Sequence, residues 1–207
     1  MASSKIPSPP IDNALLARDW VFSIFGPDTF VVPQNWFKVP KTKYADLTLA
    51  DTHKPEYLAK FSDIETNVAV YLGEKSGGIV EIDFDDPADF ATWCNENPLL
   101  SNTLIHKSYR GYGVWFKMEG DYPKSKQCKP HYEWRANGNL ATIWGWHGTG
   151  KVPYRIYNDA MPLTIKWADI VWPQGWPLPE VVSPGQAAFD ELVKTHHEPF
   201  RFNKSGG

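Results

Sequence analysis

The chain has 207 residues and a formal net charge of −3, with 42% hydrophobic and 22% charged residues. A chain of this size fits one domain or two closely packed subdomains and needs no disulfide or metal to fold. The charge balance excludes bulk electrostatic adhesion to nucleic acid or membrane, but not a local basic groove. Two cysteines are too few for a disulfide framework, and no apolar run reaches the ~20 residues of a transmembrane helix. Because the N-terminus also lacks the apolar segment of a signal peptide, we expect a cytoplasmic protein.

Capping residues and apolar spacing predict helices and short strands in the first half of the chain. Asp12 or Asn13 can cap a first helix that Gly26 ends, and Asp86 can cap a later helix with Pro87 at its first position. Helices are expected over 13–25, 55–61 and 87–97, and strands over 29–32, 67–72 and 79–84.

The second half is rich in β-branched and aromatic residues. It predicts strands over 103–106, 113–117, 132–135, 140–144 and 153–157, with short helices over 166–170 and 184–194. Asn137-Gly138 favours a type I′ turn, so we expect 132–135 and 140–144 to pair as a hairpin. The order of elements indicates an α+β fold with an antiparallel-leaning sheet.

The segment from Glu81 to Asp86 carries the most chemistry. Side chains alternate along a strand, so Glu81, Asp83 and Asp85 share one face while Ile82 and Phe84 face the core. We expect Asp83 and Asp85 to lack a Lys or Arg partner, and a divalent cation would relieve their repulsion. Mg²⁺ and Mn²⁺ take such hard oxygen ligands. The alternative is a solvent-facing strand end.

A third carboxylate, Glu133, lies on the strand predicted over 132–135 and shares a face with Arg135. Ligands from separate strands would fix a metal site rigidly. The alternative is a salt bridge between Glu133 and a basic neighbour.

Two loops offer groups for binding phosphates. Residues 107–113 carry Ser108 and Arg110 beside glycines, and residues 145–151 carry His147 and Lys151. The second loop imitates a P-loop, but Val152 stands where a Ser or Thr must bind Mg²⁺, so it is interpreted as a glycine-rich hairpin.

These motifs together resemble the primase–polymerase (prim-pol) domain of plasmid and viral replication proteins, in the archaeo-eukaryotic primase superfamily. The matching segments are an apolar strand ending in Asp83-x-Asp85, Glu133 in Tyr-Glu-Trp-Arg, and the stretch 145–154. The resemblance spans roughly residues 12–157.

The resemblance implies an RRM-like sheet packed with a smaller N-terminal αβ unit. It further implies template-directed nucleotidyl transfer, with Mg²⁺ or Mn²⁺ held by Asp83, Asp85 and Glu133. The remaining candidates would bind the nucleotide phosphates, namely Ser108, Arg110, His147 and Lys151. The implied partners are a single-stranded DNA template or primer, dNTP or NTP, and a helicase domain of a longer protein, with no membrane. We expect a flexible N-terminus over 1–11, a catalytic core over 12–160, and a helical extension and tail over 161–207.

One departure concerns the family's motif histidine. Gly113 occupies its expected position, so that either Arg110 supplies the charge, or nucleotide binding is weakened, or His106 takes the role. Two other functions stay open: a catalytically weakened primase-like module for DNA binding or replication initiation, and an unrelated α+β metal-dependent nuclease.

Overall fold

The helices begin and end where the capping residues place them. The computed structural model describes residues 4–10 and 12–181. Helix α1 (Ala14–Phe25) is capped by Asn13, whose side chain accepts the N–H groups of two first-turn residues, and it ends at Gly26 with φ 101°. Helix α3 (Pro87–Glu96) is capped by the Asp86 side chain. A short α2 (Pro55–Leu58) continues as a 3₁₀ turn over Ala59–Phe61. These confirm the predicted helices of the first half.

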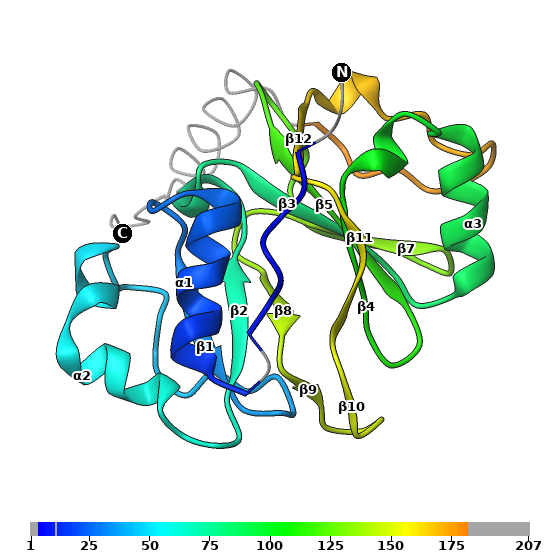
Figure 1. Ribbon diagram of the computed structural model, residues 1–207. Helices are drawn as coiled ribbons and strands as arrows, with labels where there is room; N and C mark the ends of the chain where they lie inside the picture. Colours follow the sequence, from blue (N-terminus) through cyan, green and yellow to red (C-terminus); the bar gives the residue numbers. More distant parts are fainter. Residues whose placement is uncertain (1–3, 11, 182–207) are drawn as a thin grey trace, which may run out of the picture.

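A small antiparallel sheet supports the N-terminal part of the chain. Its order is β1-β2-β8, with bounds β1 (Val31–Gln34), β2 (Asn67–Tyr71) and β8 (Leu140–Trp144). Helix α1 lies along this sheet on the left of the molecule (Figure 1) and buries Val21 against Val68 and Ile143 in a common core.

A larger sheet fills the right half of the molecule (Figure 1). Its order is β11-β4-β5-β3-β7-β6, with β12 also pairing β5. All its pairings are antiparallel except that of β12 with β5. The bounds are β3 (Ile79–Phe84), β4 (Leu104–Lys107), β5 (Tyr112–Met118), β6 (Lys126–Cys128), β7 (Tyr132–Arg135), β11 (Arg155–Asp159) and β12 (Leu163–Ile165). The fold is therefore mixed α+β with mostly antiparallel sheets, as the sequence predicts.

The two faces of the larger sheet differ in chemistry. Ile82 and Phe84 of β3 point to one face, where they pack with Phe90 and Trp93 of α3. Glu81 and Asp83 alternate with these residues along the strand, so their side chains point away from that core. The alternation along β3 thus places its carboxylates on the face that α3 does not cover.

The predicted hairpin at Asn137-Gly138 is wrong in its pairing. A tight turn is present: Asn139 N–H donates to Ala136 C=O at 3.2 Å, and Gly138 has φ 88°. However, β7 pairs β3 and β6, whereas β8 pairs β2. The Asn137 side chain accepts the Glu74 N–H at 2.9 Å, which ties the turn to the segment that follows β2. The turn therefore directs the chain from one sheet to the other.

Two short strands, β9 (Trp146–His147) and β10 (Val152–Pro153), enclose the glycine-rich loop. They confirm the hairpin interpretation of residues 145–151. The 166–170 prediction corresponds to a 3₁₀ turn over Trp167–Asp169, and the helix predicted over 184–194 lies outside the described residues.

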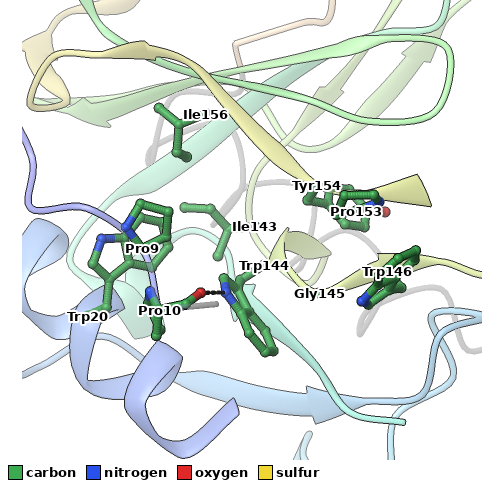
Figure 2. Close-up of a pocket in the computed structure, with 10 residues that line it drawn as sticks. All are labelled: Pro9, Pro10, Trp20, Ile143, Trp144, Gly145, Trp146, Pro153, Tyr154 and Ile156. Carbon is green, nitrogen blue, oxygen red and sulfur yellow. Dashed lines mark hydrogen bonds between the residues drawn. The ribbon is translucent and has the colours of Figure 1, made fainter. Parts of the chain in front are cut away.

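The N-terminal prolines line a pocket beside the small sheet (Figure 2). The indole N–H of Trp20 donates to Pro7 C=O, and that of Trp144 donates to Pro10 C=O, each at 2.7 Å. Within the described part of the chain, no helix has the length and apolar character needed to cross a membrane.

Candidate active site

Arg135 lies at the centre of a carboxylate cluster on the face of the larger sheet opposite α3. Its Nη1 donates to Glu81 Oε2 at 3.1 Å, and its Nη2 contacts Asp83 Oδ2. Its Nε and Nη2 also donate to Glu133 Oε2, at 3.0 and 2.8 Å. The expectation that Asp83 lacks a basic partner is therefore wrong, and the salt bridge considered for Glu133 is present.

Strand register brings these groups together. Asp83 of β3 stands opposite Glu133 of β7 on one side and opposite Gly113 of β5 on the other, and Glu81 stands opposite Arg135. Directly opposite residues in an antiparallel pair project to the same face with neighbouring Cβ atoms. The sequence showed that Glu133 and Arg135 share a face, but not which strand lies next to them.

Burial dominates the electrostatics of the cluster. Glu81 has only 1% of its surface exposed, and burial raises its pKa to about 8 although Arg135 acts in the opposite direction. Burial likewise raises the pKa of Asp83, again opposed by Arg135. Burial alone would lower the pKa of Arg135, but the three carboxylates outweigh it and raise that pKa. Glu81 is therefore mostly protonated at neutral pH, and Asp83 and Glu133 share the guanidinium charge.

Asp85 does not join this cluster. It follows the last residue of β3, its side chain is 69% exposed, and one of its oxygens lies 3.5 Å from Lys129 Nζ. Among residues 4–10 and 12–181, no group of three His, Cys, Asp or Glu side chains is arranged to hold a metal ion. The three-carboxylate set expected from the sequence is not preassembled.

Asp83 and Glu133 nevertheless fit part of a cation site. One oxygen of each contacts the same Arg135 Nη2 atom, so the two carboxylates converge on one point from neighbouring strands. Mg²⁺ is commonly bound by one or two carboxylates together with substrate phosphates. The donor set therefore suits a cation that arrives with a nucleotide.

His106 explains the glycine at position 113. A Cβ on Gly113 would lie 2.3 Å from His106 Cε1 and 2.2 Å from Glu81 Oε1, so the imidazole occupies the space above the glycine. The Trp115 indole donates to His106 Nδ1 at 2.7 Å, which leaves the proton of the neutral ring on Nε2. Burial, reinforced by Lys38 and Arg135, lowers the pKa of His106 to about 3. A neutral histidine from the neighbouring strand β4 thus lies directly over Gly113.

Basic groups gather on the loops around His147. Lys38 Nζ lies 6.0 Å from the centre of the Tyr154 ring, and that ring lies 6.3 Å from the His147 ring. Burial lowers the pKa of His147, and the charges of Lys38 and Arg110 lower it further. The Tyr109 ring lies 5.6 Å from the His147 ring, and the Arg110 guanidinium lies 5.9 Å from the Tyr109 ring centre. The structure therefore brings together two of the predicted phosphate-binding residues.

Lys38 is not among the candidates that the sequence identifies. Its Nζ lies 6.0 Å from the centre of the Tyr154 ring, and that ring lies 5.5 Å from the His106 ring, so the loop after β1 reaches the strands that carry the cluster. Its backbone has φ 65°, a conformation held by the bond from Lys38 N–H to Asn35 C=O at 2.9 Å. No sequence pattern indicated that this loop reaches the strands of the larger sheet.

The other two predicted phosphate-binding residues lie differently. The Ser108 hydroxyl donates to Gly111 C=O at 3.3 Å within the β4–β5 hairpin. Lys151 is exposed in the turn between β9 and β10, where its backbone N–H donates to His147 C=O at 2.7 Å.

Comparison with known proteins adds no assignment. No protein-family model matches the chain, and no curated protein matches its sequence. Its function is therefore inferred from the geometry of the site and from the motif resemblance.

Proposed function

We propose that the chain is a metal-dependent nucleotidyltransferase, a DNA primase or polymerase of the prim-pol type that joins (d)NTPs on a template. The observation that carries the proposal is the convergence of Asp83 and Glu133 from adjacent strands, with the cations Lys38 and Arg110 and the imidazole of His147 on the surrounding loops. Nucleotidyl transfer needs acidic oxygens for a cation next to positive charge for a triphosphate. We also propose that the larger sheet corresponds to the family's RRM-like catalytic sheet.

Asp83 and Glu133 would hold Mg²⁺ or Mn²⁺, with Asp85 turning in from the end of β3 as the third carboxylate. When bound, the cations would activate the attacking 3′-hydroxyl and stabilise charge on the triphosphate. Arg110 and His147 would contact the phosphates, together with Lys38. Ser108 and Lys151 would line the path of the triphosphate or of the DNA backbone.

Arg135 keeps the carboxylates stable when no cation is present. Its guanidinium contacts all three acids and retains Glu81 as a partner if Asp83 and Glu133 turn toward a cation. Glu81 is the most deeply buried of the three and lies farthest from solvent access. We therefore assign Glu81 the role of anchoring Arg135.

The partners that follow from this function are a single-stranded DNA template or primer and dNTP or NTP. A helicase domain in a longer replication protein and a cytoplasmic location belong to the same proposal.

A catalytically weakened DNA-binding module is the second candidate. It is favoured by the full pairing of Asp83 and Glu133 with Arg135 and by the exposed position of Asp85. In that case Arg135 would occupy the cation position permanently, and the protein would bind DNA without joining nucleotides.

Primer extension distinguishes the two. Wild-type protein is incubated with a labelled primer–template, dNTPs and Mn²⁺ or Mg²⁺, beside Asp83→Asn and Glu133→Gln. Glu96→Gln, which removes an exposed carboxylate at the end of α3, is the matched control. Extension by wild type and Glu96→Gln, with loss in both cluster variants, supports the transferase. Primer binding without extension supports the second candidate, and shortening of the DNA supports a nuclease.

A further inference from the structure

A groove of about 800 Å³ lies beside the proposed active site and is lined largely by aromatic side chains. Trp36 and Phe37 come from the loop after β1, and Trp146 and His147 come from β9. Phe37 is 70% exposed and Trp146 is 43% exposed, while Ile64 at the rim is 94% exposed. Large apolar groups that gather in an exposed groove commonly mark a binding site.

The backbone holds these rings in place without burying them. Gly148 N–H donates to Trp36 C=O at 2.8 Å, and Phe37 N–H donates to the Asn35 side chain at 2.9 Å. A Cβ on Gly148 would lie 2.8 Å from the Phe37 ring and 2.8 Å from Trp36 C=O, so the two loops approach closely only because residue 148 is glycine. The rings of Trp36 and Trp146 lie 6.1 Å apart. The backbone segments that carry Trp36, Phe37 and Trp146 are therefore held together before any ligand binds.

The basic side chains on one side of the groove suit a polyanionic ligand. Lys151 and His147 line it. Lys38 Nζ lies 6.0 Å from the Tyr154 ring and the Arg110 guanidinium lies 5.9 Å from the Tyr109 ring, and both rings lie within 6.3 Å of the His147 ring. Within the described part of the chain, none of the three cations Lys38, Arg110 and Lys151 forms an ion pair. The acidic residues in the lining are Asp12 and Glu65. The groove therefore combines exposed aromatic rings with unpaired positive charge.

We propose that this groove binds unpaired bases of single-stranded DNA, stacked on Phe37 and Trp146, with the sugar–phosphate chain passing over Lys151 and Lys38. Every base has a π-face, so aromatic platforms flanked by cations bind single strands with little sequence preference. A paired duplex keeps its bases stacked internally and offers no face to the rings. The inference rests on the proposed function, because the strand in the groove would be the template of the same reaction.

Aromatic contacts link the groove to the proposed active site. His147 lines the groove, its ring lies 6.3 Å from the Tyr154 ring, and the Tyr154 ring lies 5.5 Å from the His106 ring. The pocket lined by the N-terminal prolines shares Trp144 and Trp146 with the groove (Figure 2). Trp146 lies next to Pro153, its partner in the β9–β10 hairpin, and is half-exposed.

Fluorescence anisotropy with a short labelled oligothymidylate, in EDTA, tests the inference. Phe37→Ala and Trp146→Ala should each weaken binding roughly 5- to 100-fold, the range expected when one stacked base loses its platform. Leu99→Ala is the control, because Leu99 is 80% exposed and lies outside the groove. Thermal melting of each variant confirms that it is folded.

Three outcomes would overturn the inference: equal binding by both aromatic variants and the parent, equal binding of an abasic oligonucleotide, or equal binding of duplex DNA. The same assay with Asp83→Asn separates the two proposals, since this variant should bind DNA normally. If the aromatic variants bind DNA as the parent does while the parent extends primers, the groove proposal is refuted and the transferase proposal stands. If the parent extends no primer but its DNA binding still depends on Phe37 and Trp146, the transferase proposal is refuted and the groove proposal stands.

Discussion

Replacing Arg135 with Gln should destabilise the protein strongly, because it leaves three carboxylates without their shared cation. The guanidinium contacts Glu81, Asp83 and Glu133, and its side chain is mostly buried. Breaking a buried ion pair from one side costs about 3–5 kcal/mol, because the remaining charge is buried and unpaired. We expect a loss in this range.

For a chain of this length, each kcal/mol lowers the melting temperature by about 2–4 °C, so Arg135→Gln should melt roughly 6–20 °C below the parent. Circular dichroism melts in EDTA measure this loss. Adding Asp83→Asn to the Arg135 variant should restore part of it, because the carboxylate that contacted Arg135 Nη2 is then replaced by a neutral amide. If Asp83 and Glu133 accept a cation, Mn²⁺ should raise the melting temperature of Arg135→Gln more than that of the parent.

An Arg135→Gln variant that melts within about 1 °C of the parent in EDTA would refute this electrostatic reasoning. It would mean that the carboxylates are neutral or hydrated and that Arg135 is not their stabilising partner. Arg155→Gln is a matched control, because Arg155 is an exposed arginine on β11; it should change the melting temperature little.

Three further predictions concern the same face of the sheet. Asp83→Asn should abolish nucleotide incorporation yet melt at or above the parent temperature, because Arg135 keeps two other carboxylate partners; a lower melting temperature would contradict this. Gly113→Ala should destabilise the protein by about 1–3 kcal/mol in denaturant melts, because the added methyl overlaps His106 and Glu81; an unchanged midpoint would contradict the packing. His106 has a pKa lowered to about 3, so its contribution to stability is present above its ordinary pKa of 6.5 and is lost as the pH falls toward 3. The stability difference between the parent and His106→Gln should therefore shrink by up to about 1.4 kcal/mol per pH unit below pH 6.5, and a pH-independent difference would show that His106 titrates normally.

Local signals in the sequence were sufficient for individual elements. Asp86 and Pro87 specify the start of α3, and the alternation from Ile79 to Phe84 specifies both β3 and its buried face. These signals act over a few residues, through capping hydrogen bonds and the alternation of side chains along a strand. They can therefore be interpreted without knowing the rest of the fold.

The pairing of strands that are distant in the sequence could not be predicted from such local signals. Asn137-Gly138 forms a turn as predicted, but the side chain of Asn137 binds the backbone of Glu74, and the strands after and before the turn join different sheets. A dipeptide determines the turn geometry and does not determine which strand is the neighbour.

The candidate site shows the same limit. Its acidic residues were identified from the sequence, whereas their pairing with Arg135 depends on the register of β3 against β7. The approach of Lys38 and the position of His106 above Gly113 depend on a loop and on a neighbouring strand. Contacts across strands are set by the tertiary fold, and no spacing along the chain encodes them.

Manganese binding tests most directly the central claim that Asp83 and Glu133 hold a divalent cation. Electron paramagnetic resonance measures free Mn²⁺ as protein is added in the presence of a non-hydrolysable dNTP. Wild type and Glu96→Gln should remove Mn²⁺ from solution, whereas Asp83→Asn and Glu133→Gln, although folded, should not. Equal Mn²⁺ binding by Asp83→Asn and wild type, or no binding by folded wild type, would contradict the proposed cation site.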